Sequence, residues 1–180
     1  LENDLKASFF GSEAIDEFYD VFAVNMRDLG SPVHSKLFFE NIMKVFESRT
    51  KIILVKHKSN IIGAALCFFF KDTISIPWVS SLRSHFALYP NNILYWDAMK
   101  YAIKNGYSRF DFGRSSINSG TYEFKKRWGA APVQLFWDYF NKNNSEDLDL
   151  SINVSKKYQM AIKMWQMIPV SVSRIIGPPL

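Results

Sequence analysis

The chain has 180 residues, of which 48% are hydrophobic and 16% aromatic, and it carries a formal net charge of +5. This length and composition predict one folded domain with a sizeable core, and they exclude a disordered polar chain. The charge permits a phosphate-bearing or nucleic-acid partner without requiring one, because a solvated basic surface is the commoner reason for it. A single cysteine, Cys67, excludes an internal disulfide, and three scattered histidines predict no zinc site. We also expect no tightly bound cofactor.

No stretch of the sequence reaches the ~18 apolar residues of a membrane span, and no signal peptide opens it. We therefore expect a cytoplasmic protein, either free or at the inner face of the membrane. The first residue is Leu1 rather than Met, so we expect a fragment or a processed chain that has lost an upstream domain.

The first third predicts a lead-in over residues 1–12 and then two helices, over 13–29 and 36–47. Ser12 and Ser35 are the expected N-caps. Apolar residues recur on the second helix at helical spacing, and we expect them to face the core: Leu37, Phe38, Ile42, Val45 and Phe46.

Polar residues gather where the first of these helices ends. Asn25, Arg27 and Asp28 precede Gly30-Ser-Pro32, which stops the helix. They can line a substrate entrance, or they can cap the helix and face solvent. The sequence favours neither interpretation.

Three strands are predicted next, over residues 51–57, 61–71 and 73–80. The second is almost wholly apolar, which is typical of a central strand covered on both faces. Pro77 lies inside the third strand, and proline cannot donate a hydrogen bond to a neighbour. We therefore expect a bulge or a splay there, with backbone groups open to a ligand.

A polar connection containing Ser80, Ser81 and Arg83 leads to a predicted helix over residues 93–105. Its apolar residues are expected to be buried, and they include Ile93, Trp96, Met99, Tyr101, Ala102 and Ile103.

Residues 107–129 contain the most informative pattern in the chain. It predicts a strand over Arg109–Phe112, a permissive turn over 113–120 and a basic helix that Thr121 caps and Gly129 ends. Charged groups at a strand end, free loop N–H groups and a cationic helix are suited to binding an anion or to acyl transfer. The alternative is an ordinary strand–helix connection.

The last part predicts a strand over residues 133–140, a charged loop over 141–150 and an amphipathic helix over 156–168, after which the chain ends loosely. We expect a main domain over residues 1–145 and a C-terminal helix and tail over 146–180, packed on that domain or extending from it. The helix carries Lys156, Lys157 and Lys163 beside methionines, so a membrane surface is an alternative partner for it.

The order of elements resembles the GNAT acyltransferase fold. This is an α/β fold with a mixed, mostly antiparallel sheet that has a splayed strand pair and helices on its flanks. The residues also resemble FemAB-related proteins, in particular the group associated with PEP-CTERM/exosortase systems and exopolysaccharide gene clusters. The likeness covers most of residues 14–140, and the following motifs carry it: Asn25-Met-Arg-Asp-Leu-Gly-Ser-Pro32, Trp78-Val-Ser-Ser-Leu-Arg83, Pro90-Asn-Asn-Ile-Leu-Tyr-Trp96, Phe110-Asp-Phe-Gly-Arg-Ser115 and Gly120-Thr-Tyr-Glu-Phe-Lys-Lys-Arg-Trp-Gly129.

The resemblance implies the second of two tandem GNAT-like domains and transfer of an acyl or aminoacyl group to an amine or hydroxyl acceptor, on a saccharide or a peptide, in exopolysaccharide or envelope assembly. The donor is expected as a co-substrate, either aminoacyl-tRNA or acyl-CoA. The Phe-Lys pair of the family is matched by Phe124-Lys125.

Lys125 is therefore the first catalytic candidate, because its cation can stabilise an oxyanion or hold a phosphate. The alternative is that Lys125 is an ordinary solvated lysine. Asp111 is a candidate base, an orienting partner for Arg114 or Lys125, or a cap for the Gly113 turn. Tyr122 is a candidate proton or hydrogen-bond donor. The remaining candidates are expected to bind donor or acceptor, and they are Trp78, Ser80, Ser81, Arg83, Arg114, Ser115, Asn25, Arg27 and Asp28.

One departure separates this sequence from ordinary coenzyme-A-dependent GNAT enzymes. Their phosphate-binding loop carries glycines, whereas the stretch from Ser80 to Asn92 has none. This argues against standard coenzyme A binding and favours aminoacyl-tRNA, another acyl carrier, or a non-catalytic module that keeps the fold and docks on a membrane or a protein.

Overall fold

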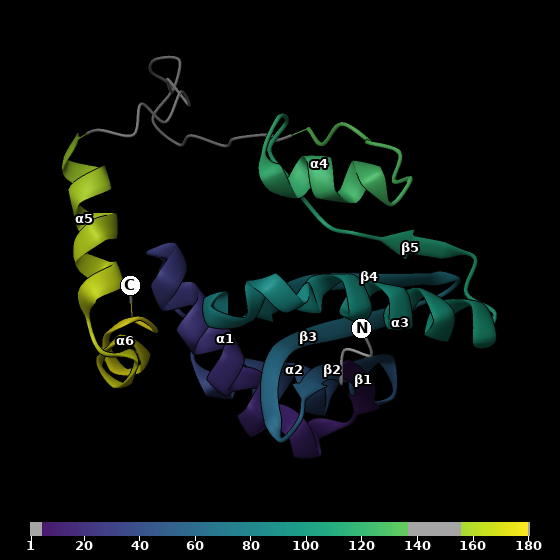
Figure 1. The fold of residues 1–180 in the computed structure, drawn as a ribbon. Coiled ribbons are helices and arrows are strands. Elements are labelled where there is room, and N and C mark those ends of the chain that lie inside the picture. Colours follow the sequence, from purple (N-terminus) through teal and green to yellow (C-terminus); the bar gives the residue numbers. More distant parts are fainter. Residues whose placement is uncertain (1–4, 137–155, 180) are drawn as a thin grey trace, which may run out of the picture.

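The computed structural model describes residues 5–136 and 156–179. Its centre is a five-stranded sheet whose strands follow one another in sequence order (Figure 1). Strands β1 to β4 pair antiparallel, and β5 runs parallel to β4. The strands are β1 (Leu5–Phe10), β2 (Thr50–His57), β3 (Asn60–Phe70), β4 (Thr73–Ser81) and β5 (Arg109–Asp111).

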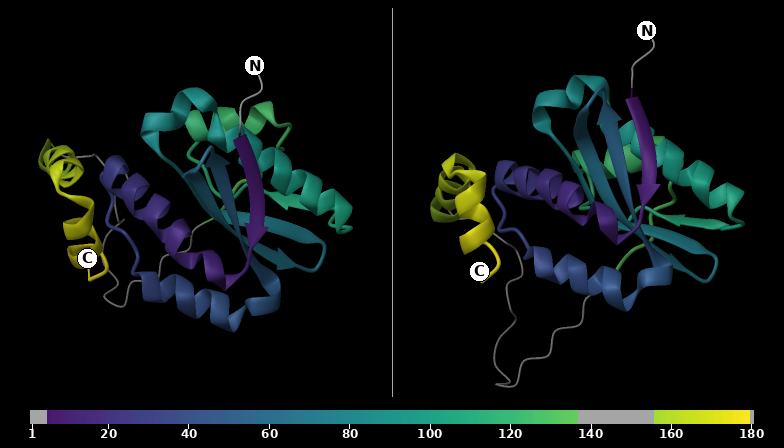
Figure 2. Two further views of the ribbon diagram at one scale, coloured as in Figure 1. Left: turned by 60° about the horizontal axis from the view of Figure 1, so that its bottom comes forward. Right: turned by 90° about the horizontal axis from the view of Figure 1, so that it is seen from below.

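Helices cover both faces of this sheet (Figure 2). The described α-helices are α1 (Ile15–Leu29), α2 (Lys36–Val45), α3 (Pro90–Lys104), α4 (Gly120–Arg127), α5 (Lys156–Met167) and α6 (Val170–Ile176), with short 3-10 helices η1 (Ser12–Ala14), η2 (Glu47–Arg49) and η3 (Arg83–Leu88). Along β2, Ile52 and Leu54 pack with α1 and α2, while Ile53 and Val55 pack with α3. On β3, Ala64 and Leu66 likewise pack on the α1 and α2 side and Ala65 and Cys67 on the α3 side, so the prediction that this strand is covered on both faces is confirmed.

Strand β1 corrects the prediction of a lead-in. It pairs with the whole length of β2, from Leu5 opposite His57 to Phe10 opposite Ile52. The ring of Phe9 stacks on Tyr101 of α3 with centroids 4.3 Å apart. Only tertiary pairing explains this strand, because six residues with weak alternation give little local signal.

Helix caps follow the predictions in part. Ser35 caps α2, because its hydroxyl oxygen accepts a hydrogen bond from the Phe38 N–H at 3.1 Å. Ser12 instead opens a 3-10 turn, and α1 starts at Ile15 without a side-chain cap. The cap of α4 is Ser119 rather than Thr121, since the Ser119 oxygen accepts from the Tyr122 N–H.

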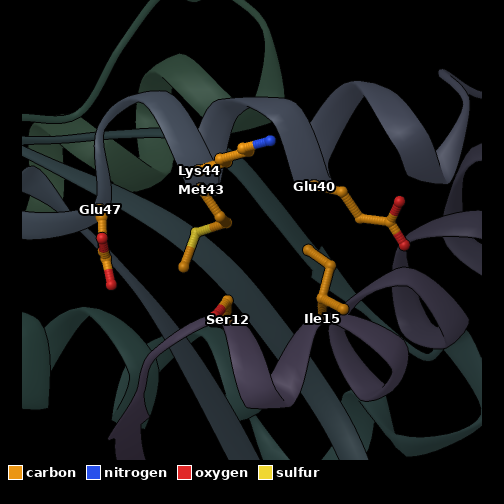
Figure 3. A pocket seen from close by; sticks show the side chains of 6 residues that line it. All are labelled: Ser12, Ile15, Glu40, Met43, Lys44 and Glu47. Atoms are coloured by element: carbon orange, nitrogen blue, oxygen red, sulfur yellow. The ribbon is translucent and has the colours of Figure 1, made fainter.

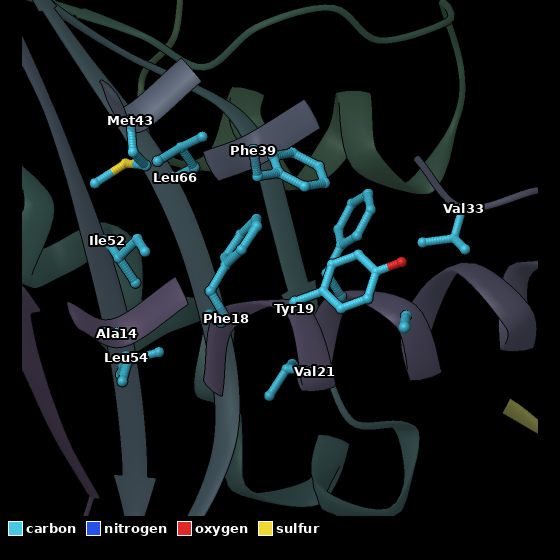
Figure 4. Packing of buried hydrophobic residues seen from close by; sticks show 13 residues of the cluster. Ala14, Phe18, Tyr19, Val21, Val33, Phe39, Met43, Ile52, Leu54 and Leu66 are labelled. Carbon is cyan, nitrogen blue, oxygen red and sulfur yellow. The ribbon is translucent and has the colours of Figure 1, made fainter. Parts of the chain in front are cut away.

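The buried face of α2 differs from the prediction. Phe39 and Met43 are buried in the core beside Phe18 and Phe22 (Figure 4). Of the five residues predicted to face inward, Ile42 packs against this core, whereas the other four are exposed: Leu37, Phe38, Val45 and Phe46. Apolar residues lie all around this short helix, so several phases of a 3.6-residue period fit the sequence equally well.

Helix α3 shows the same kind of correction. Leu94, Tyr95 and Ala98 are buried against the sheet, and of the six residues predicted to be buried, Trp96 and Ile103 lie on the outside. The other four pack in or against the core as predicted, and they are Ile93, Met99, Tyr101 and Ala102. The helix starts at Pro90, three residues earlier than predicted. Proline is well suited to this first position because it has no N–H that needs a partner.

The C-terminal part also departs from the prediction. Residues 133–136 form no strand, and the rest of that predicted strand, 137–140, lies outside the described residues. The tail is not loose either, because α6 follows α5 and both contact α1. The guanidinium of Arg174 donates to the Asp20 carboxylate at 2.7 Å and lies over the Tyr19 ring.

Substitution of Gly30 tests whether α5 packs against the end of α1. Gly30 ends α1 with φ +77, and a Cβ at this position would meet Ile162 of α5, with the Ile162 carbonyl oxygen at 3.1 Å. Gly106 also has φ +77, but a Cβ there would meet nothing within 4 Å. We expect Gly106→Ala to lower the free energy of unfolding by about 1 kcal/mol through backbone strain alone. Gly30→Ala should lose a further ~1–3 kcal/mol through overpacking. Equal losses in urea denaturation would contradict the docking.

Candidate active site

Strands β4 and β5 part soon after they meet. Their parallel pairing covers only Thr73 to Ser75 against Arg109 to Asp111. Beyond Ser75 the register of β4 with β3 shifts, so that Ile76 and Pro77 together oppose Cys67. This is the predicted bulge, and it lies at the proline that has no N–H to pair.

From the bulge onward, β4 continues to Ser81 without a paired strand on its β5 side among the described residues. The chain leaving β5 rises away from β4 toward α4 (Figure 1). Beyond Ser75, the backbone of β4 therefore makes no ladder hydrogen bonds to β5. The predicted splay of this strand pair is confirmed.

The turn after β5 brings two predicted residues together. Asp111 Oδ1 accepts a hydrogen bond from the Gly113 N–H at 2.7 Å, and Gly113 has φ +69. From α4, Lys125 Nζ donates to the carbonyl oxygens of Gly113 at 3.1 Å and Arg114 at 2.8 Å. Asp111 and Lys125 thus bind the same turn. Asp111 accepts from an N–H of the turn, and Lys125 donates to two of its carbonyl oxygens.

The electrostatics of Lys125 differ from those of a solvated lysine. Its partial burial lowers the pKa of the ammonium, and the nearby Asp111 carboxylate partly offsets this by favouring the charged form. An ammonium has three N–H groups, and the two hydrogen bonds above use two of them. The third can donate to an oxygen that develops negative charge.

The other candidates on this loop lie close by but have different partners. The Ser115 hydroxyl donates to the Arg114 carbonyl at 2.9 Å, so that oxygen accepts from both Ser115 and Lys125. Tyr122 lies in the first turn of α4, where its N–H binds the Ser119 cap. The end of β5, the loop after it and α4 therefore carry five predicted site residues, and they are Asp111, Arg114, Ser115, Tyr122 and Lys125.

The end of β4 carries polar groups on both faces. Ser80 is buried and accepts from Asn25 Nδ2 of α1 at 3.1 Å. Ser81 is also buried, and its hydroxyl donates to Asn91 Oδ1 of α3 at 2.7 Å. These two contacts tie α1 and α3 to the end of β4, where β4 pairs with β3 but has no β5 partner.

Three candidates lie elsewhere. Arg27 binds Asp28 at 2.7 Å and the Ile168 carbonyl at 3.2 Å, while the Asp28 carbonyl accepts from Gln166. The structure thus places Arg27 and Asp28 at the contact between α1 and the C-terminal helices. Arg83 is exposed on η3.

Trp78 packs between rings, with centroid distances of 5.3 Å to Phe39, 5.8 Å to Phe38 and 6.1 Å to Phe68. It is part of the wall of the core on the α2 side, and it remains partly exposed. The contacts of Trp78 are therefore those of a residue packed against the core.

Two residues of this region had no predicted role. Asn91 is the partner of Ser81, and the Pro90-Asn-Asn92 run was its only sequence signal. Tyr95 is buried, with ring centroids 6.2 Å from Phe110 of β5 and 5.5 Å from Phe124 of α4, so it connects α3, β5 and α4. Burial raises the pKa of Tyr95 to about 12, which keeps its hydroxyl neutral.

A separate pocket of about 270 Å³ lies between η1 and α2 (Figure 3). It is lined by Ser12, Ile15, Glu40, Met43, Lys44 and Glu47, none of which is a predicted site residue. The described residues contain no group of three or more His, Cys, Asp or Glu side chains that could hold a metal ion. Within the same described part, no helix has the length and apolar content needed to cross a membrane.

Comparison with known proteins gives a family match and many structural matches. Residues 7–126 match the family described as "Acetyltransferase (GNAT) domain". A search of curated proteins finds no match. The crystal structure of FemX superposes on this chain with a TM-score of 0.65 and a sequence identity of 15%. The superposition covers 71% of this chain and 50% of FemX, so this chain spans half the length of FemX.

Single-domain acetyltransferases superpose over nearly their whole length. An aminoglycoside acetyltransferase, meta-AAC0020 from an uncultured soil metagenomic sample, solved with sisomicin, gives a TM-score of 0.62 at 9% identity, with coverage of 78% of this chain and 97% of that one. The aminoglycoside N-acetyltransferase AAC(6')-Iy in complex with CoA gives 0.60 at 9%, with coverage of 77% and 95%. At such identities these likenesses establish the fold: a five-stranded mixed sheet flanked by helices.

Proposed function

Since this chain belongs to the acetyltransferase (GNAT) domain family, we propose that it transfers an activated acyl or aminoacyl group to an amine or hydroxyl acceptor. One observation carries the proposal. The partly buried cation of Lys125 binds the turn that follows β5, close to where the pairing of β4 and β5 ends. A cation held in this way is preorganised for charge that develops on a reacting carbonyl.

In the proposed reaction, the acceptor nitrogen or oxygen attacks the donor carbonyl carbon and forms the new bond. The carbonyl oxygen becomes an oxyanion, which the third N–H of Lys125 stabilises. The intermediate then collapses, the bond to the carrier oxygen or sulfur breaks, and that atom leaves with the electron pair. The acceptor proton passes to Asp111 or to water.

The donor is best argued from the start of α3. Pro90 has no N–H, and the Asn92 N–H already donates to the Tyr89 carbonyl at 3.0 Å. The preceding residues form η3 instead of a glycine loop, and Tyr89 has φ +53. Few backbone N–H groups remain to hold a pyrophosphate. We therefore propose a FemAB-type aminoacyl-tRNA donor ahead of acyl-CoA.

Thermal stability tests the donor directly, since a ligand of the native state raises Tm by mass action. We expect charged tRNA to raise Tm more than uncharged tRNA, and acetyl-CoA and longer acyl-CoAs to leave it unchanged. Each ligand is titrated separately into the purified chain. A Tm rise with acyl-CoA would show that the argument from α3 is wrong and would make this a coenzyme-A-dependent enzyme.

Asp111 has two proposed roles, which Asp111→Asn separates. Asparagine retains an oxygen for the Gly113 N–H but removes the charge that raises the pKa of Lys125. Activity that needs the ammonium is lost as pH rises through the pKa of Lys125. We therefore expect the alkaline limb of the pH–kcat profile to move to lower pH, with kcat near neutrality changed less than about threefold. A loss of more than ~100-fold at every pH would instead identify Asp111 as the base.

The biological context rests on the motif resemblance alone. We propose a saccharide or peptide acceptor in exopolysaccharide or envelope assembly of the PEP-CTERM/exosortase type. Both candidate donors are made in the cytoplasm, so we place the reaction there. We also propose that residues 1–145 form the transferase domain, and that a further GNAT-like domain contributes to holding the acceptor.

A non-catalytic module with the same fold is the second candidate function. The same sparse set of N–H groups at α3 favours it, because a domain that binds no donor has no need of them. Turnover distinguishes the two functions: a module would bind none of the donors and would transfer nothing.

A further inference from the structure

Helices α5 and α6 have one side that is firmly docked. Ile162 of α5 lies against Gly30, and the Arg27 side chain reaches the Ile168 carbonyl between the two helices. On α6, Ser173 and Gly177 are buried, and Gly177 lies against Val33. These contacts fix which side of each helix faces outward, at the edge of the molecule beyond α1 (Figure 1).

The outward side of α5 carries three exposed methionines. Met160, Met164 and Met167 follow one another at spacings of four and three residues, so they share one helix face. Their exposed fractions are 60%, 62% and 78%. We call these three residues the methionine face. On α6, Ile175 is 75% exposed as well.

The same segment carries only positive charge. Residues 156–180 contain four Lys or Arg residues and no Asp or Glu. Arg174 is committed to Asp20 and lies over Tyr19. Lys163 is exposed and lies on the methionine face by spacing, three residues after Met160 and four before Met167. An apolar stripe that carries an exposed cation complements a surface that is apolar inside and anionic outside.

We propose that α5 and α6 dock this chain on an anionic lipid surface, with the methionine face at the boundary of the acyl chains and Lys163 among the headgroups. Neither helix is long enough to span a bilayer, so this is attachment in the plane of the interface. Flexible thioether side chains suit a fluid surface because they adapt their shape to it. This inference does not depend on the transferase proposal, since a binding module would dock in the same way.

Co-sedimentation of the full chain with vesicles tests the proposal. Vesicles of phosphatidylcholine alone are compared with vesicles that also contain phosphatidylglycerol, at low and high salt. We expect binding only to the anionic vesicles, weaker at high salt. Replacing the three methionines of the methionine face with serine should lower the partition coefficient by at least about tenfold, and Lys163→Glu should lower it by roughly fivefold or more.

Two matched variants control for general surface effects. Ile103→Ser removes an apolar side chain of α3 whose exposed fraction, 78%, equals that of Met167 on α5. Lys104→Glu reverses the charge of an exposed residue on the same helix, α3. Both should bind vesicles like the parent chain. Equal binding to neutral and anionic vesicles, or equal losses in the controls, would overturn the proposal. A third outcome would also overturn it. Light scattering would show that the parent chain is a dimer, the dimer would bind no vesicles, and the methionine variant would be a monomer. The methionine face would then join two copies of the chain.

Discussion

Lys125→Ala is expected to lower kcat of acyl transfer by roughly 100- to 1000-fold, the usual cost of removing one donor to an oxyanion. The substitution takes away the only side chain that binds both carbonyls of the turn after β5 in the described structure. It also removes a cation whose pKa burial lowers. The measurement is steady-state kinetics with whichever donor raises Tm, at a pH below the alkaline limb.

Lys126→Ala is the matched control, since Lys126 is the next residue of the same helix and is exposed. It should leave kcat within about twofold, as expected for a surface substitution. A purely structural role of Lys125 predicts a different result: lower Tm and weaker donor binding, with kcat restored at saturating donor. Unchanged turnover in Lys125→Ala would remove this residue from the mechanism. Lys125→Arg should recover only part of the loss, because a planar guanidinium cannot replace an ammonium in this geometry.

Phe39→Ala is expected to lower the free energy of unfolding by about 3–5 kcal/mol, through lost burial and the cavity that remains. Phe39 is fully buried, and its ring centroid lies 4.9 Å from Phe22, 5.1 Å from Phe18 and 5.3 Å from Trp78. Phe39 of α2 therefore contacts both α1 and β4. Its ring lies in the core with Phe18 of α1 (Figure 4). Urea denaturation of the two proteins measures the difference.

Leu37→Ala is the control for Phe39→Ala, because the two residues lie on the same helix. The sequence pattern predicted that Leu37 is buried, whereas the structure buries Phe39. Leu37 is 61% exposed, so its removal should change the unfolding free energy by less than about 1 kcal/mol. A larger loss at Leu37 than at Phe39 would mean that α2 is rotated relative to the arrangement described here.

Local patterns predicted most of the sheet correctly. The three strands of the meander end within one residue of their predicted bounds, because β-branched and apolar runs between turn residues are a strong short-range signal. The bulge at Pro77 was also predictable, since a missing N–H is a property of the residue itself. Strand β1 was not, because its six residues become a strand only when β2 offers them an edge.

The candidate site was predicted in its residues but not in its contacts. The motif around residues 107–129 pointed to Asp111 and Lys125, whereas their shared turn at Gly113 is visible only in the fold. Arg27 and Asp28 had two open interpretations, and the structure brings them to α5 and α6, more than 130 positions away in the chain. No local pattern contains such a partner.

By itself, the sequence determined the α/β class, the position of the bulge and the chemistry available after β5, because these follow from propensity, from proline and from residue type. The tertiary structure alone decided which faces of α2 and α3 are buried, that residues 5–10 form an edge strand, and which sides of α5 and α6 remain exposed. The physical reason is the same in each case. A helix that is apolar all round, or a short strand with weak alternation, is stable in several orientations, and only contact with distant elements selects one of them.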